Sequence, residues 1–258
     1  MFVYRGKLNW FNFVLDEGFT LIFHDSEFKA GASAIAAWKW TVTGDGSKNQ
    51  NAFMQGVIDS VVISGTGERQ IFFYQNQYYR FQATFSDDMK SITVVMSNPS
   101  GEKSSPTTLT NVYDSPLTAG IIPRYFLGNI SFYPYATDEM FLVIIPHGSE
   151  LNSDILAYWQ WTVDAGGNKK SNFNFKDIVR SAEQTSVGEI VTFGDNTASY
   201  YSFDGTIAND GKTFSVKMKD PKGNTAGPFV LALQVWSHMH TWSSGAWRRV
   251  NKYHGKTT

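Results

Sequence analysis

Apolar and polar residues alternate along most of this chain with a period of two, not the 3.6 of a helix. The alternating segments are rich in β-branched and aromatic residues and are bounded by Gly, Asn, Asp and Ser, a combination typical of half-buried β-strands joined by turns. Only residues 51–61 and their counterpart 173–182 depart from it and indicate a short helix or an ordered loop. The pattern predicts an all-β protein.

The second half of the chain repeats the first. Trp38-Lys39-Trp40-Thr41-Val42 returns 121 positions later as Trp159-Gln160-Trp161-Thr162-Val163, and Gly6 returns 122 positions later as Gly128. Matches in this order indicate a tandem duplication, and the unit is long enough to be a complete small domain. We expect about seven strands in each copy, at residues 3–13, 19–24, 34–42, 70–75, 78–85, 91–98 and 107–113, and at 125–135, 140–145, 155–163, 189–193, 200–207, 213–219 and 229–236.

Pro and Gly residues mark the join between the copies. Pro116, Gly120 and Pro123 interrupt any strand there, so we place a linker between the two domains. The predicted organisation is a first β domain at residues 1–113, a linker at 114–124, a second β domain at 125–236 and a basic, aromatic tail at 237–258. The strand spacing fits two internally duplicated antiparallel β domains, each a sandwich or a closed barrel.

Composition removes several classes of protein. The 258 residues carry a formal charge of −1, so no basic field attracts nucleic acid, and the absence of cysteine excludes disulfides and thiolate chemistry. No apolar run approaches the roughly 20 residues that cross a bilayer as a helix. We therefore expect no nucleic-acid partner and no integral membrane protein. The localisation expected is cytoplasmic, or secreted with the signal missing from this chain.

Motifs for catalysis are not apparent. The sequence has no P-loop, dinucleotide fingerprint, metal-binding helix or nucleophile elbow. His238 and His240 would share one side of an extended chain, but no third ligand accompanies them, so we expect neither a metal nor a cofactor. Asp16-Glu17 and Asp138-Glu139 are interpreted as solvated hairpin residues, not as a catalytic carboxylate pair. The sequence favours a non-catalytic protein and leaves an enzyme as the less favoured reading.

The repeated Trp strand offers two interpretations. Trp38 and Trp40 share one face of their strand with Ala36 and Val42, while Lys39 points the other way. The favoured interpretation is a wall of the hydrophobic core, because that face is apolar throughout. The alternative is an aromatic platform for a ligand.

Polar loops beside the Trp strands carry the candidate binding residues. Carbohydrate hydroxyls need several short donors and acceptors next to an apolar face, and these loops supply both. The predicted ligand-binding residues of the two copies are Asp45, Asn49, Asn51, Tyr74 and Asn76, and Asn168, Lys169, Asn172, Asp195 and Asn196.

Three functions remain open from the sequence. The first is a non-catalytic, lectin-like carbohydrate-binding protein with two related sites, whose duplication would allow bivalent binding of glycans. The second is a carrier or enzyme that holds a small apolar ligand inside a lipocalin-like barrel. The third is a membrane-active, toxin-like defence protein that uses its aromatic tail as an interfacial anchor. The sequence leaves the oligomeric state undetermined.

Overall fold

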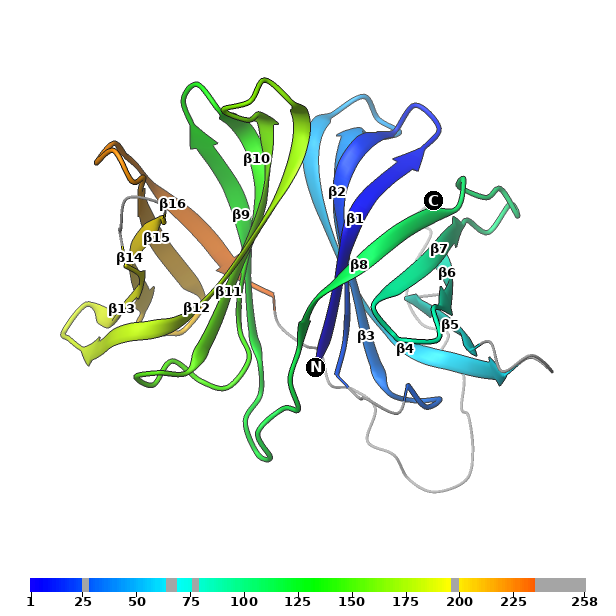
Figure 1. Cartoon of the computed structure of the whole chain (residues 1–258), viewed down its shortest axis with the longest axis horizontal. Helices are drawn as coiled ribbons and strands as arrows, with labels where there is room; N and C mark the ends of the chain where they lie inside the picture. The colour runs from blue at the N-terminus through cyan, green and yellow to red at the C-terminus, as the bar shows by residue number, and fades with distance from the viewer. Residues whose placement is uncertain (25–27, 64–68, 76–78, 196–199, 235–258) are drawn as a thin grey trace, which may run out of the picture.

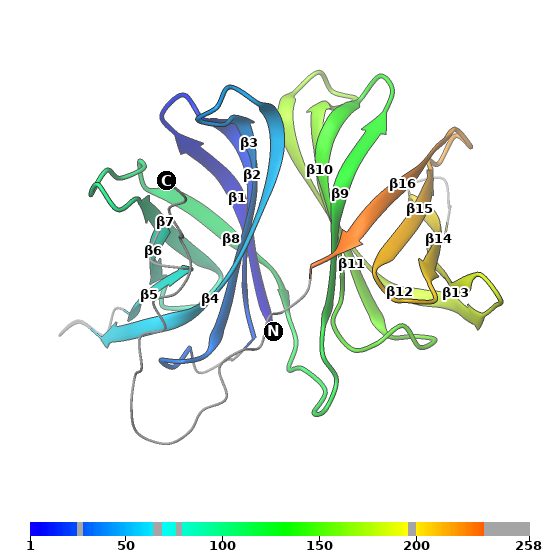
Figure 2. The ribbon, with the colours of Figure 1, turned by 180° about the vertical axis from the view of Figure 1, so that it is seen from behind.

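The computed structural model describes residues 1–24, 28–63, 69–75, 79–195 and 200–234. These residues form two closed antiparallel barrels in tandem, each with eight strands (Figures 1 and 2). The predicted all-β fold and its internal duplication are confirmed, and each copy is a barrel, not a sandwich. No helix in this described part is long and apolar enough to span a membrane. The predicted tail, with His238 and His240, lies outside the described residues.

Consecutive strands pair around each barrel, and the first strand closes on the last. The first barrel comprises β1 (Phe2–Trp10), β2 (Val14–Phe23), β3 (Ser33–Val42), β4 (Lys48–Ile63), β5 (Arg69–Gln75), β6 (Tyr79–Phe85), β7 (Ser91–Ser97) and β8 (Thr107–Asp114). The second comprises β9 (Arg124–Phe132), β10 (Ala136–Ile145), β11 (Asp154–Val163), β12 (Lys169–Gln184), β13 (Gly188–Gly194), β14 (Ser202–Ala208), β15 (Thr213–Lys219) and β16 (Thr225–Leu233).

The helix or loop expected at residues 51–61 and 173–182 is wrong, because both segments lie within long strands, β4 and β12. The first part of β4 pairs with β3, its last residues pair with β5, and its register shifts between Ile58 and Ser60. The strand β12 shows the same shift between Val179 and Ser181. A register shift breaks the alternation of apolar and polar residues, which is why the periodicity did not predict a strand here.

The expected solvation of Asp16-Glu17 and Asp138-Glu139 is also wrong for the two glutamates. The strand predicted at residues 3–13 ends at Trp10, and β2 begins at Val14, so Asp16 and Glu17 lie within β2. Asp138 and Glu139 lie within β10 in the same way. Glu17 and Glu139 are buried. Asp16 and Asp138 have positive φ angles of 56° and 50° and stand where the β1–β2 and β9–β10 registers are irregular. Both copies therefore keep a bulge at this position.

Each barrel is filled by its own hydrophobic core. Trp38 and Trp159 are fully buried there, as the core interpretation predicted. The repeated glycines mark the closure of each barrel. A Cβ on Gly6 would lie 2.6 Å from the Thr108 carbonyl oxygen on β8, and one on Gly128 would lie 2.7 Å from that of Val230 on β16. Only glycine permits strands to approach this closely.

A third apolar cluster lies between the barrels, where β1–β3 face β9–β11 (Figure 1). Strands β2 and β10 end in runs of seven buried residues, since one side faces the barrel interior and the other faces the opposite barrel. This packing places the β1–β2 and β3–β4 turns on the same side of the molecule as the β9–β10 and β11–β12 turns (Figures 1 and 2). Residues at these turns form the candidate site.

Candidate functional site

The predicted binding loops that the structure describes lie at one end of each barrel. In an antiparallel meander, successive connections alternate between the two ends, so the β1–β2 and β3–β4 connections share an end with the start of β6. The loop around Asp45 and the start of β6 at Tyr79, which are separate in sequence, are thereby brought to the same rim of the first barrel. The equivalent connections of the second barrel share its corresponding rim. We call these two regions the aromatic ends, because aromatic residues line them.

A Trp–Tyr ring pair recurs at both aromatic ends. Trp40 and Tyr79 lie with ring centroids 5.8 Å apart and planes at 42°. Their counterparts Trp161 and Tyr201 lie 5.9 Å apart at 40°. Each Trp also contacts the fully buried Trp two residues before it, at 5.3 Å in both copies. The core therefore fixes these ring pairs, while Trp40, Tyr79 and Tyr201 stay partly exposed at the rim.

Aromatic residues also occupy the β1–β2 and β9–β10 turns, where polar residues are usual. Phe11 is 54% exposed, Phe13 38% and Tyr133 93%. The Phe13 carbonyl accepts a 3.1 Å hydrogen bond from the Val42 N–H, and the Tyr135 carbonyl accepts an equal one from Val163. Each turn is thus held against the end of the Trp strand. Sequence reasoning missed these residues, although aromatic residues at equivalent turns of both copies were a visible signal.

Asp45 organises the β3–β4 loop. Its carboxylate accepts hydrogen bonds from the Thr43 hydroxyl and, at 3.0 Å, from the Ser47 N–H. These bonds, that from Thr43 first, lower the pKa of Asp45 from 3.8 to about 2. Asn49, just beyond, is exposed with a φ of 57°, a conformation that Asn tolerates. Asp45 therefore shapes the loop, and Asn49 presents its side chain to solvent.

The pKa of Asp45 gives a direct test of this loop. Carboxyl NMR should show Asp45 titrating at about pH 2 instead of near 3.8, because the bonds from Thr43 and Ser47 favour the carboxylate. The stabilisation is present above about pH 4 and is lost as the pH falls towards 2. Thr43→Val should raise the pKa. A wild-type Asp45 that titrates near 3.8 would contradict this loop geometry.

The β11–β12 loop of the second copy is built in the same way from a different residue. The Asp164 carboxylate accepts hydrogen bonds of 2.9 Å from the N–H groups of Gly166 and Asn168, and the Asn168 amide donates to the same carboxylate. These contacts, led by Asn168, hold the pKa of Asp164 below its usual range. Asn168 is thus engaged in shaping its loop, whereas Lys169 is exposed at the rim.

The expectation that Asn51 and Asn172 are solvent-accessible loop residues is wrong. Both lie within strands, half-buried between the barrels, and each donates from its amide to the opposite barrel. The Asn51 amide donates to the Gly128 carbonyl at 2.9 Å, and the Asn172 amide to the Gly6 carbonyl at 2.6 Å. Their pairing with β3 and β11 places both residues inside the strands and in the interface between the barrels, not in the loops of the aromatic ends.

The structure describes only some of the remaining predicted binding residues. Asp195 is exposed directly after β13, at the aromatic end of the second barrel. Tyr74 lies in β5, but its side chain is outside the described residues, as are Asn76 and Asn196. Among the residues that are described, no three His, Asp or Glu side chains are grouped closely enough to hold a metal ion.

The two aromatic ends differ in one ring. Phe173 of β12 stacks on Trp159 with centroids 4.5 Å apart and contacts Trp161 at 5.8 Å and Tyr201 at 5.5 Å. The residue at the equivalent position of the first barrel is Ala52. Trp161 is consequently only 5% exposed, whereas Trp40 remains half-buried. The first barrel thus offers the more open aromatic surface.

Each aromatic end combines partly exposed rings with exposed polar side chains held by ordered loops. Comparison with protein-family models, with curated proteins and with solved structures finds no match. A ring face can contact the C–H groups of a ligand, and the Asn, Lys and Asp side chains beside it can hydrogen-bond to hydroxyls.

Proposed function

We propose that this protein is a non-catalytic, lectin-like carbohydrate-binding protein with two related sites, one at the aromatic end of each barrel. The observation that carries the proposal is the Trp40–Tyr79 pair at the end of the first barrel that also carries the exposed Asp45 and Asn49, with a Trp161–Tyr201 pair at the end of the second barrel that carries the exposed Lys169. A saccharide would place a C–H face on the rings and its hydroxyls against the loop. The first barrel holds the stronger site, because Ala52 leaves its Trp more exposed.

Packing inside the barrels favours the rim over the interior as the binding place. In the first barrel the rings of Phe28 and Phe85 lie 4.6 Å apart. In the second, Phe193 and Phe203 stack at 4.5 Å with planes at 10°. A carrier or enzyme with an interior ligand would have to displace rings that already contact one another. Removing one large aromatic side chain from a core costs about 3–5 kcal/mol. A ligand at the rim displaces only water.

Asn49→Gly should weaken glycan binding by about ten- to a hundredfold, because it removes a hydrogen-bonding side chain and leaves a ligand hydroxyl unpaired. Glycine keeps the positive φ of this position at no steric cost. The measurement is a glycan array probed with the full chain, followed by affinity measurements on the retained glycans.

Asn152→Gly is the matched control. Asn152 is also exposed, with a φ of 67°, but lies in the β10–β11 connection at the opposite end of its barrel. The control should therefore bind like the wild type. Retention of no glycan, or equal affinity for wild type and Asn49→Gly, would overturn the assignment and favour the interior-ligand alternative.

A further inference from the structure

The interface between the barrels repeats its polar contacts in reciprocal pairs. Asn51 donates to the Gly128 carbonyl, and the equivalent Asn172 donates to that of Gly6. Lys39 donates to the carbonyl of Asp138, and the equivalent Gln160 donates to that of Asp16 at 2.9 Å. Reciprocity of this kind defines an isologous interface, the arrangement found in two-fold symmetric dimers. The bulges at Asp16 and Asp138 supply the carbonyls that the other barrel binds.

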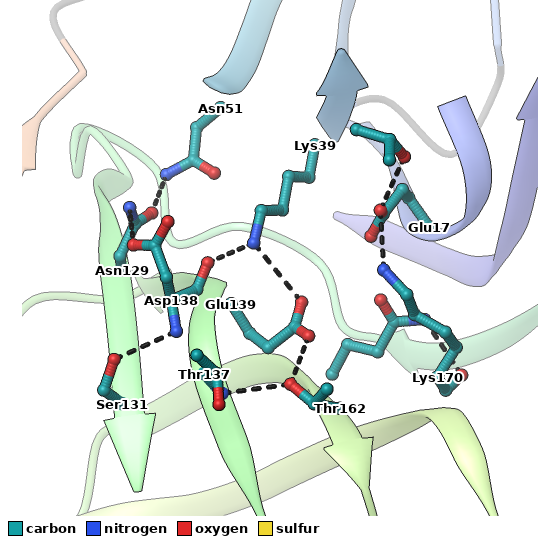
Figure 3. A network of polar contacts seen from close by, with 12 residues as sticks. Glu17, Lys39, Asn51, Asn129, Ser131, Thr137, Asp138, Glu139, Thr162 and Lys170 are labelled. Carbon is teal, nitrogen blue, oxygen red and sulfur yellow. Dashed lines mark hydrogen bonds and ion pairs between the residues drawn. The ribbon is translucent and has the colours of Figure 1, made fainter. Parts of the chain in front are cut away.

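Two ion pairs with buried carboxylates cross the same interface (Figure 3). Lys39 lies 3.5 Å from Glu139, with both side chains 3% exposed. Lys170 lies 2.7 Å from Glu17, whose side chain is 1% exposed. The glutamates occupy equivalent positions, and each also accepts a hydrogen bond from an equivalent threonine of its own barrel, Thr41 or Thr162. Each buried carboxylate is therefore neutralised by a lysine from the opposite barrel.

Arg5 breaks the symmetry. This buried residue of β1 corresponds to Leu127 in the second copy. Its guanidinium donates to the Phe173 carbonyl at 2.7 Å and to the Asn174 side chain at 2.6 Å. It also lies over the Tyr158 ring, 4.9 Å from the centroid. Burial lowers the pKa of Arg5 to about 10, so the group remains charged at neutral pH.

A second copy of the first barrel would not offer Arg5 the same hydrogen-bond acceptor and aromatic ring. At the positions equivalent to Asn174 and Tyr158, the first barrel has Phe53 and Ala37. A first–first pair would therefore bury two guanidinium groups without the Asn acceptor and the Tyr ring, and burying a charge with fewer hydrogen-bond partners is unfavourable. The lysine pairs do not discriminate, because Lys39 would also meet the equivalent Glu17 of another first barrel.

We propose that the first barrel is a specific docking partner of the second barrel, that the two stay associated without their covalent link, and that Arg5 selects this pairing. The surface involved is the apolar cluster of β1–β3 and β9–β11 with its reciprocal bonds and two ion pairs. An apolar centre flanked by hydrogen bonds and ion pairs that cross between the two sides is the composition of a stable protein interface. The partner recognised is the second barrel of the same chain.

The test starts from the folded full chain. A protease site inserted between Ala119 and Gly120, which are exposed in the connection between the barrels, is cleaved after folding, and the products are weighed by native mass spectrometry at low micromolar concentration. The expected product is a one-to-one complex of the first and second barrels. Separation into single barrels would overturn the proposal.

Arg5→Leu, which installs the residue of the second copy, tests the selectivity. It should weaken the cleaved first–second complex by about ten- to a hundredfold and allow first–first pairs to form. Arg80→Leu, at a partly exposed residue of β6, is the matched control. It should leave the affinity of the first–second complex unchanged and should not allow first–first pairs to form. Asn174→Ala removes the acceptor from the other side, so the test survives if Arg5→Leu fails to fold. Wild-type affinity and selectivity in both Arg5→Leu and Asn174→Ala would refute the role of Arg5.

Discussion

Trp159→Ala should lower the free energy of unfolding by about 3–5 kcal/mol, the range measured for removing a large aromatic side chain from a core. Trp159 is fully buried and contacts the rings of Phe141, Trp161, Phe173, Tyr201 and Phe203. Alanine would leave a cavity among these rings, and a closed barrel cannot collapse far enough to fill it. Urea unfolding followed by circular dichroism measures the effect.

Tyr133→Ala provides the control for that experiment. Tyr133 also belongs to the second barrel but is 93% exposed, so its replacement should change stability by no more than about 0.5 kcal/mol. If Trp159→Ala unfolds at the same urea concentration as Tyr133→Ala, the assignment of the Trp strand to the core is wrong.

Lys39→Met should destabilise the protein by a similar amount, about 3–5 kcal/mol, because it leaves the buried Glu139 without its cation. The methionine retains most of the aliphatic volume, so the loss reports the charge and not a cavity. The bond from Lys39 to the Asp138 carbonyl is lost in the same step. Adding Glu139→Gln should recover part of the loss, since it removes the uncompensated carboxylate.

Lys7→Met is the matched control in the same barrel. Lys7 pairs with Asp16 at 2.7 Å, but the two side chains are 37% and 48% exposed. Solvent-exposed pairs contribute about 0–1 kcal/mol, so urea unfolding should barely change. Equal destabilisation by Lys7→Met and Lys39→Met would show that the Lys39–Glu139 pair is not held in a dry interface.

Local patterns predicted much of the fold. Alternation of apolar and polar residues reports the strands wherever one face is buried, and the repeated Trp strand and Gly6 positions reveal the duplication. Closure into a barrel is not a local property. It depends on β1 reaching β8, and the clue was Gly6, whose missing Cβ makes room for the Thr108 carbonyl.

The interface between the barrels explains where the prediction of the site failed. Asn51 and Asn172 are polar residues near turns, and the sequence alone cannot show that a second barrel covers them. Their burial follows from tertiary packing between segments more than 70 residues apart. A signal was present in the continuous apolar run from Met140, since a strand that is apolar on both faces is covered on both sides.

The aromatic ends illustrate a different limit. The Trp38–Trp40 face was interpreted as either core or ligand platform, and the two residues divide between these roles by their position along one strand. Trp38 lies at the depth of the core, whereas Trp40 lies two residues nearer the rim and stays partly exposed. Ala52 and Phe173 then decide how open each rim is, which depends on a neighbouring strand and not on the Trp motif.

The most direct test of the carbohydrate-binding account is an isothermal titration of the glycan best retained on the array into the wild-type chain and into Trp40→Leu. We expect saturable binding to the wild type and about tenfold or greater weakening in the variant, because truncation of a Trp at a binding surface removes a principal contact. Near-ultraviolet circular dichroism confirms that the variant is folded. Undetectable binding at high micromolar protein, or equal affinity for both proteins, would contradict the account.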